Sequence, residues 1–107
     1  MTIPPLLEEL LRAHGASGHE DAVQAIVRRE AAAIGAEVER DVLGSTIATV
    51  PGTAGGRTIA LFAHADQVGM AVRDAGEEGL LTLTKLAAWR HADALGQRVR
   101  IDTRSGV

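Results

Sequence analysis

The sequence has no cysteine and very few aromatic residues. Its 107 residues include one Phe, one Trp and no Tyr, although 46% of them are hydrophobic. Without cysteine the chain can form neither a disulfide framework nor a thiolate zinc site, so any metal must be bound by histidine and carboxylate. Zinc fingers and disulfide-stabilised folds are therefore excluded.

The chain also lacks an excess of charge of one sign and a long hydrophobic run. It has 11 Lys and Arg against 14 Asp and Glu, a net charge of -3, and its basic residues are scattered. Scattered basic residues argue against a surface that follows nucleic-acid phosphates. No 18 apolar residues run together, and the N-terminus has neither a basic nor an apolar leader region. We expect a cytoplasmic protein with no nucleic-acid and no membrane partner.

No linker, repeat or low-complexity tract divides the sequence. A chain of 107 residues is long enough for one small domain or for part of one, since domains of roughly 100 residues are common. The pattern of apolar residues predicts an α/β fold with two N-terminal helices and a mixed β-sheet.

Helical spacing and capping residues predict the two helices. Thr2 would cap the first, with Pro4 and Pro5 in its first turn, and Gly15 would end it. The apolar face of this helix is formed by Leu6, Leu7, Leu10 and Leu11. Ser17 and a glutamate three residues later have the spacing of a capping box, which predicts the start of the second helix. That helix would end at Gly35.

Alternating residues after the second helix predict strands. Residues 38–42 and 46–50 form one expected hairpin, and residues 68–72 and 81–84 form another. Residues 58–63 are continuously apolar, which favours a central strand covered on both faces. Residues 97–103 alternate again, whereas residues 86–95 fit neither pattern.

Four histidines are candidates for chemistry, and their positions distinguish them. His14, beside Gly15 at the end of the first helix, is best explained as a structural residue near the helix dipole. His19 and His91 have no second histidine or carboxylate at ligand spacing, so we interpret both as surface residues.

His64 differs because it directly follows the apolar run 58–63 and precedes Asp66 by two residues. Ligands of α/β sheets bind beyond the carboxyl ends of the strands. A metal-binding imidazole needs an acceptor for its second nitrogen, and Asp66 is placed to be that acceptor. The alternative is a hydrogen-bonded core histidine beside a turn aspartate, because His-x-Asp alone is a short and common pattern.

The segment around these two residues resembles a known peptidase motif. Residues 63–70, AHADQVGM, resemble the AHMDEIGF segment of the M42 metallo-aminopeptidases. Other segments match in the same order: residues 6–11 with GASGHE at 15–20, DVLGSTIA at 41–48, and LGQRVRI at 95–101. The related M20 peptidases usually have valine and proline after His-x-Asp, so Gly69, Met70 and residues 96–98 fit M42 better.

The resemblance implies a co-catalytic two-metal exopeptidase, with zinc or cobalt, that removes N-terminal residues from peptides. On that pattern His64 is a metal ligand and Asp66 is a catalytic carboxylate that orients a group of the site. The family's other ligands, its general base and its last histidine lie downstream of the matching region. Residues 1–95 would belong to a zinc-peptidase-like catalytic domain, and residues 96–107 would begin an inserted β-barrel-like dimerisation domain.

Two functions follow as alternatives. The first is the N-terminal part of such an aminopeptidase, a homo-oligomer when complete, with this chain inactive alone because a single imidazole does not retain a metal. The second is a non-catalytic α/β interaction or assembly module. The chain also departs from the M42 pattern: Gln67 replaces a glutamate, Ala87 and Ala88 replace a Gly-Gly pair, and Arg90 with His91 replaces Asp-Pro.

Overall fold

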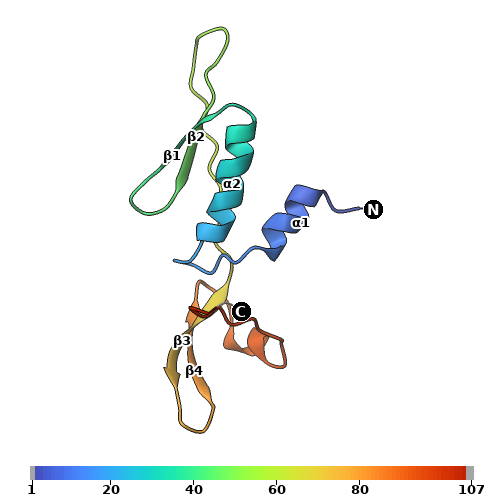
Figure 1. Cartoon of the computed structure of the whole chain (residues 1–107), viewed down its shortest axis with the longest axis vertical. Coiled ribbons are helices and arrows are strands. Elements are labelled where there is room, and N and C mark those ends of the chain that lie inside the picture. The colour runs from blue at the N-terminus through green and yellow to red at the C-terminus, as the bar shows by residue number, and fades with distance from the viewer. Residues whose placement is uncertain (1, 106–107) are drawn as a thin grey trace.

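Two helices form the N-terminal part of the chain, as the sequence predicts. The computed structural model describes residues 2–105, in which α1 spans Pro5–Arg12 and α2 spans Asp21–Ala33 (Figure 1). A bidentate ion pair connects the helices: the Arg29 guanidinium of α2 donates to both carboxylate oxygens of Glu9 of α1 at 2.7 Å. The apolar side chains of α1 and α2 leave an open groove of about 420 Å³ between them.

The predicted caps at the starts of these helices are wrong. Pro4 is the N-cap of α1, so Thr2 does not cap it. Glu20 is the N-cap of α2, and no side chain caps that helix. The carboxylate of Glu20 instead accepts a hydrogen bond from the Gly18 backbone N–H at 2.7 Å. The predicted stop of α2 is confirmed, because Gly35 has a φ of 80° and reverses the chain.

The first predicted hairpin is confirmed and packs against α2. It consists of β1 (Glu37–Arg40) and β2 (Thr46–Thr49), paired antiparallel. In its turn, the Asp41 carboxylate accepts the backbone N–H groups of Leu43 and Ser45 at 2.9 and 2.8 Å. These bonds, with the Ser45 bond the largest cause, lower the pKa of the Asp41 carboxyl. The buried side chains of this half all lie on α2, namely Val23, Ile26 and Ala31.

The second predicted hairpin is also confirmed and forms the other end of the molecule. It consists of β3 (Gly69–Ala75) and β4 (Leu81–Leu86), with a β-bulge between Val72 and Asp74. The ambiguous stretch after β4 contains a short 3₁₀-helix, η1 (His91–Ala94). The Trp89 indole N–H lies 2.8 Å from the Leu86 carbonyl and 3.2 Å from the Gly69 carbonyl, which holds this stretch against both strands.

The predicted central strand and the single mixed sheet are not found. Residues 58–63 pair with no strand in the described part of the chain, which contains two separate two-stranded antiparallel sheets. Leu61 and Phe62 are each 93% exposed. A strand that is apolar on both faces needs neighbours at both edges and a layer on each face. The described residues provide none of these, so the segment forms no strand.

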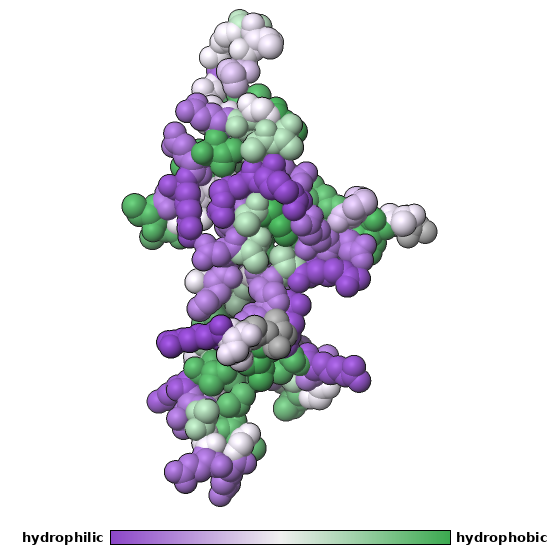
Figure 2. Space-filling model, in the orientation of Figure 1, coloured by the Kyte–Doolittle hydropathy of each residue, from purple (hydrophilic) through white to green (hydrophobic). Residues whose placement is uncertain are grey.

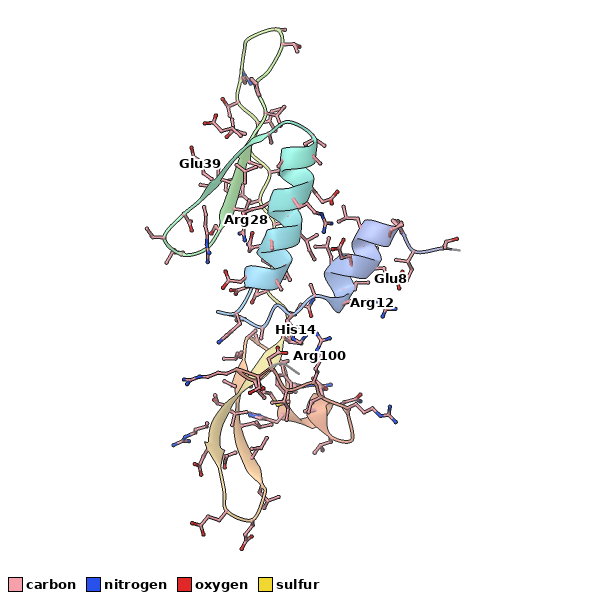
Figure 3. All side chains as sticks on the ribbon, in the orientation of Figure 1. Glu8, Arg12, His14, Arg28, Glu39 and Arg100 are labelled. Carbon is pink, nitrogen blue, oxygen red and sulfur yellow. The ribbon has the colours of Figure 1, made fainter. Side chains whose placement is uncertain are left out.

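Residues 97–103 do not form the predicted strand either. Instead they lie against the end of α1, where the Arg100 guanidinium donates to the Arg12 carbonyl at 3.3 Å and the Asp102 carboxylate pairs with the His14 ring. Figure 3 shows His14 and Arg100 close together at this junction. The predicted boundary at residues 95/96 and the inserted β-barrel-like domain stay predictions, and residues 106 and 107 of that segment lie outside the described residues.

The two ends of the molecule do not share a core. The accessible surface is 9352 Å², against roughly 5,700 Å² for a compact protein of this length. The radius of gyration is 17.9 Å, whereas a compact domain of this length has about 13 Å. Figure 2 shows apolar residues open on the surface at the β3–β4 end. In this hairpin Val72, Leu81 and Leu83 are 48%, 42% and 41% exposed. Among the described residues no helix is long and apolar enough to cross a membrane.

Ala87, just after β4, is strained, and this generates a prediction. Its φ of 63° lies in the left-handed region, which costs an L-residue about 1–2 kcal/mol. Ala87→Gly should therefore raise the free energy of unfolding by about 1 kcal/mol, measured by urea denaturation. Ala88→Gly is the control, because Ala88 has no positive φ. Equal effects of the two substitutions would contradict the strain.

Candidate functional site

His64 and Asp66 form a hydrogen-bonded pair in the loop before β3. The Nδ1 atom of His64 lies 3.0 Å from Asp66 Oδ1 and 3.1 Å from the Asp66 carbonyl oxygen. A backbone carbonyl oxygen and an ionised carboxylate oxygen can only accept hydrogen bonds. Nδ1 therefore carries a proton and donates it to them. In the neutral ring Nε2 then keeps its lone pair, which is the form of histidine that binds a metal.

The two residues differ in exposure. The His64 side chain is 85% exposed, whereas that of Asp66 is 32% exposed. Asp66 is thus held within the protein while the imidazole projects from it. The acceptor contact that the His-x-Asp spacing predicts is present, and the core-histidine alternative is wrong because His64 is not buried. Its role as a metal ligand stays a prediction.

Ser17, in the loop between α1 and α2, holds the second oxygen of Asp66. Its hydroxyl donates to Asp66 Oδ2 at 2.5 Å. This bond is the largest cause of a lowered pKa of the Asp66 carboxyl; partial burial opposes it, and His64 adds to it. Asp66 is therefore ionised at neutral pH. Sequence reasoning assigned Ser17 to a helix cap and missed this contact, because a contact between residues 49 positions apart leaves no signal in local spacing.

The loop that carries Ser17 docks directly on the loop that carries Asp66. The Gln67 backbone N–H donates to the Gly15 carbonyl at 2.6 Å, and Ala16 and Gln67 form a parallel β-bridge. Glycines allow this close approach. A Cβ on Gly69 would lie 3.0 Å from the Ala16 Cβ, and a Cβ on Gly15 would lie 2.8 Å from a methyl of Val23.

The other three histidines lie outside this pair. His14 pairs with Asp102 rather than with the last carbonyls of α1. His19 and His91 are exposed, as predicted. Within residues 2–105 no three or more His, Asp or Glu side chains are grouped so that they could hold a metal ion.

Comparison with known proteins places this site in a family. A family model described as M42 glutamyl aminopeptidase matches residues 44–107, which include His64 and Asp66. The chain belongs to the M42 glutamyl aminopeptidase family. The resemblance found in the sequence motifs is thereby confirmed.

Two curated relatives of this M42 chain extend the similarity to its N-terminal part. The "Putative aminopeptidase FrvX" of Escherichia coli (strain K12) is 34% identical over 102 residues, which are 95% of this chain and 28% of the relative. The "Putative aminopeptidase" of Acetivibrio thermocellus is 30% identical over 95 residues, 89% of this chain and 28% of the relative. The M42 chain therefore spans little more than a quarter of the length of these relatives.

Gln67, which replaces the glutamate of the M42 pattern, contributes to the site through its backbone. Its N–H forms the bond to Gly15, and its side chain is exposed. The hydrogen bond that docks the two loops therefore does not involve the Gln67 side chain. The substitution removes one negative charge next to His64 and leaves the Ser17–Asp66–His64 contacts in place.

The close packing at Gly15 generates a prediction for this M42 chain. Gly15→Ala would place a methyl group 2.8 Å from the Val23 side chain and 3.3 Å from the Ala65 carbonyl oxygen. We expect the free energy of unfolding to fall by about 1–3 kcal/mol, the usual cost of overpacking. Gly52→Ala is the matched control, because nothing lies within 4 Å of its Cβ position. Two equally stable variants would show that the loops do not dock as described.

Proposed function

We propose that this chain supplies the first part of the active site of a two-metal aminopeptidase, with His64 as a metal ligand and Asp66 as the residue that orients it. The observation that carries the proposal is the hydrogen bond from His64 Nδ1 to the ionised Asp66 carboxylate. Metal-binding histidines usually donate their second N–H to a carboxylate, carbonyl or water, which fixes the ring and its tautomer.

His64, oriented by Asp66, is suited to provide one ligand of a metal site. The His64 ring is exposed and held at Nδ1, so Nε2 is open to a cation. The structured part of the chain groups no three His, Asp or Glu side chains, whereas zinc sites need three or four protein ligands. We propose that the remaining ligands and a general base come from the part of the enzyme that the relatives have in addition, and that the chain alone is inactive.

The residues of this chain have distinct tasks in that mechanism. Asp66 holds the proton of His64 on Nδ1 and keeps the imidazole in one orientation. Ser17 keeps Asp66 within the protein. When bound, two divalent cations, zinc or cobalt, would supply Lewis-acid activation of the scissile carbonyl and of water near neutral pH. The substrates are peptides with a free N-terminus, and the complete enzyme is a cytoplasmic homo-oligomer in this proposal.

Histidine substitutions test the role assignment in the whole polypeptide that the reading frame encodes. His64→Ala should abolish metal-dependent hydrolysis of aminoacyl-p-nitroanilides, because it removes a ligand. His14→Ala should leave turnover near normal, since the His14 ring pairs with Asp102 and not with His64 or Asp66. Both variants are assayed for bound zinc and cobalt as well as for rate. Equal losses of activity would refute the assignment.

The same polypeptide provides a second check. If the reading frame continues with further Asp, Glu and His ligands, the proposal stands. If it stops after Val107, and calorimetry detects no zinc or cobalt bound to the 107-residue chain, the aminopeptidase proposal is wrong for this protein.

One observation favours a second function, an interaction or assembly module. Residues 58–63 pair with no strand among the described residues, and Ile59, Leu61 and Phe62 are almost fully exposed. An unpaired apolar segment presents free backbone N–H and C=O groups that pair readily with another strand. A second copy of this chain carries the same segment, so two copies can pair along it.

Sedimentation of the 107-residue chain tests this second function. If residues 58–63 pair between copies, the chain should associate as its concentration rises, and Leu61→Ser should weaken the association at least about tenfold, as expected when a large apolar side chain leaves an interface centre. Leu43→Ser is the matched control, because Leu43 is 89% exposed in the β1–β2 turn. A monomer at all concentrations would exclude the module.

A further inference from the structure

We propose that Ser17 is a positioning residue: its hydroxyl holds one oxygen of Asp66 so that the other oxygen faces His64 Nδ1. This inference deepens the proposed function and rests on it for its purpose, but the contacts that carry it are independent of any metal. They connect a loop between two helices to the His-x-Asp segment that follows 47 positions later.

The two oxygens of Asp66 have different partners. Oδ2 accepts from the Ser17 hydroxyl at 2.5 Å, and Oδ1 accepts from His64 Nδ1 at 3.0 Å. The terminal torsion of an aspartate is broad and roughly two-fold, so an unrestrained carboxylate rotates easily. The bond from Ser17 to Oδ2 fixes the plane of the carboxylate. Oδ1 then accepts the hydrogen bond from His64 Nδ1 in one direction. Ser17 thereby adds to the stabilisation of the proton on His64 Nδ1, for which the Asp66 carbonyl oxygen is a second acceptor at 3.1 Å.

Ser17 is free for this task and is itself held in place. It does not cap α2, although its position suggests a cap. The residues before it are fixed by the bridge between Ala16 and Gln67 and by the bond from Gln67 to Gly15. The close contact between Ala16 and Gly69 limits movement further. The serine hydroxyl therefore reaches Asp66 from a backbone that is already positioned.

A purely structural explanation predicts something different. On that explanation the Ser17–Asp66 bond only joins two loops, and its loss weakens their docking without a specific effect on the histidine. The chain contains a matched pair for comparison. Ser45 also supports an aspartate, Asp41, through its backbone N–H and its side chain, in the turn between β1 and β2. Asp41 accepts its hydrogen bonds from Leu43 and Ser45 within the β1–β2 turn, so Ser45→Ala removes a serine hydroxyl that supports an aspartate other than Asp66.

The experiment measures the tautomer of His64 in the metal-free 107-residue chain. Long-range ¹H–¹⁵N NMR spectra, recorded well above the pH range in which imidazole titrates, give the ratio of the Nδ1–H to the Nε2–H form. In the unsubstituted chain the Nδ1–H form should dominate. Ser17→Ala should lower this ratio at least about threefold, a conservative effect for loss of a charge-assisted hydrogen bond. Ser17→Thr, which keeps a hydroxyl, should restore it, and Ser45→Ala should leave it unchanged.

Hydrogen exchange of the Gln67 amide, measured on the same samples, reports the docking of the loops. A lower tautomer ratio in Ser17→Ala with an unchanged Gln67 exchange rate supports the positioning role. An unchanged ratio overturns it. A lower ratio that comes with loss of Gln67 protection, including loss of the fold, also overturns it, because Ser17 is then structural. Since no metal is present, these outcomes are separate from those of the His64→Ala activity test.

Discussion

The hydrogen bond between the Gly15 carbonyl and the Gln67 N–H is the contact on which the candidate site depends. It lies where the loop after α1 meets the loop before β3, and its length of 2.6 Å requires that the two backbones nearly touch. Gly15 and Gly69 make this possible, because a side chain at either position would press on Val23 or Ala16. Ser17 reaches Asp66 only while this docking persists.

The helices and strands that form are those whose backbone N–H and C=O groups find hydrogen-bond partners nearby in the sequence. Each hairpin pairs its strands locally, and α2 buries Val23 and Ile26 as it packs beside the first hairpin. Residues 58–63 form the most apolar six-residue run of the chain, yet they form no strand because no described strand lies at their edges. Hydrophobicity alone therefore does not make a strand. A strand also requires neighbouring strands with which its backbone N–H and C=O groups can pair.

Local patterns in the sequence predicted the elements whose causes are local. Alternation around the turns at Gly44 and Gly79 predicted both hairpins, and the φ of 80° at Gly35 agrees with its assignment as a helix stop. The Ser17 cap and the strand at 97–103 were wrong, because tertiary partners took the residues concerned. The Thr2 cap was wrong because α1 begins later, with Pro4 as its N-cap. Ser17 is the clearest case: its spacing to Glu20 fits a cap, but its hydroxyl bonds to Asp66. The His64–Asp66 contact was predictable since it spans only two residues.

The distance in sequence between Gly15 and Gln67 has a consequence for the order of folding. Their contact closes a loop of roughly 50 residues, whose chain entropy costs about 2 kcal/mol more than that of a four-residue turn. Hairpins close much shorter loops and form within about 1–10 μs. The helices and both hairpins should therefore form first, and His64 should acquire its fixed orientation late, when the two loops meet. The orientation proposed for His64 thus depends on a long-range contact that forms after the local elements.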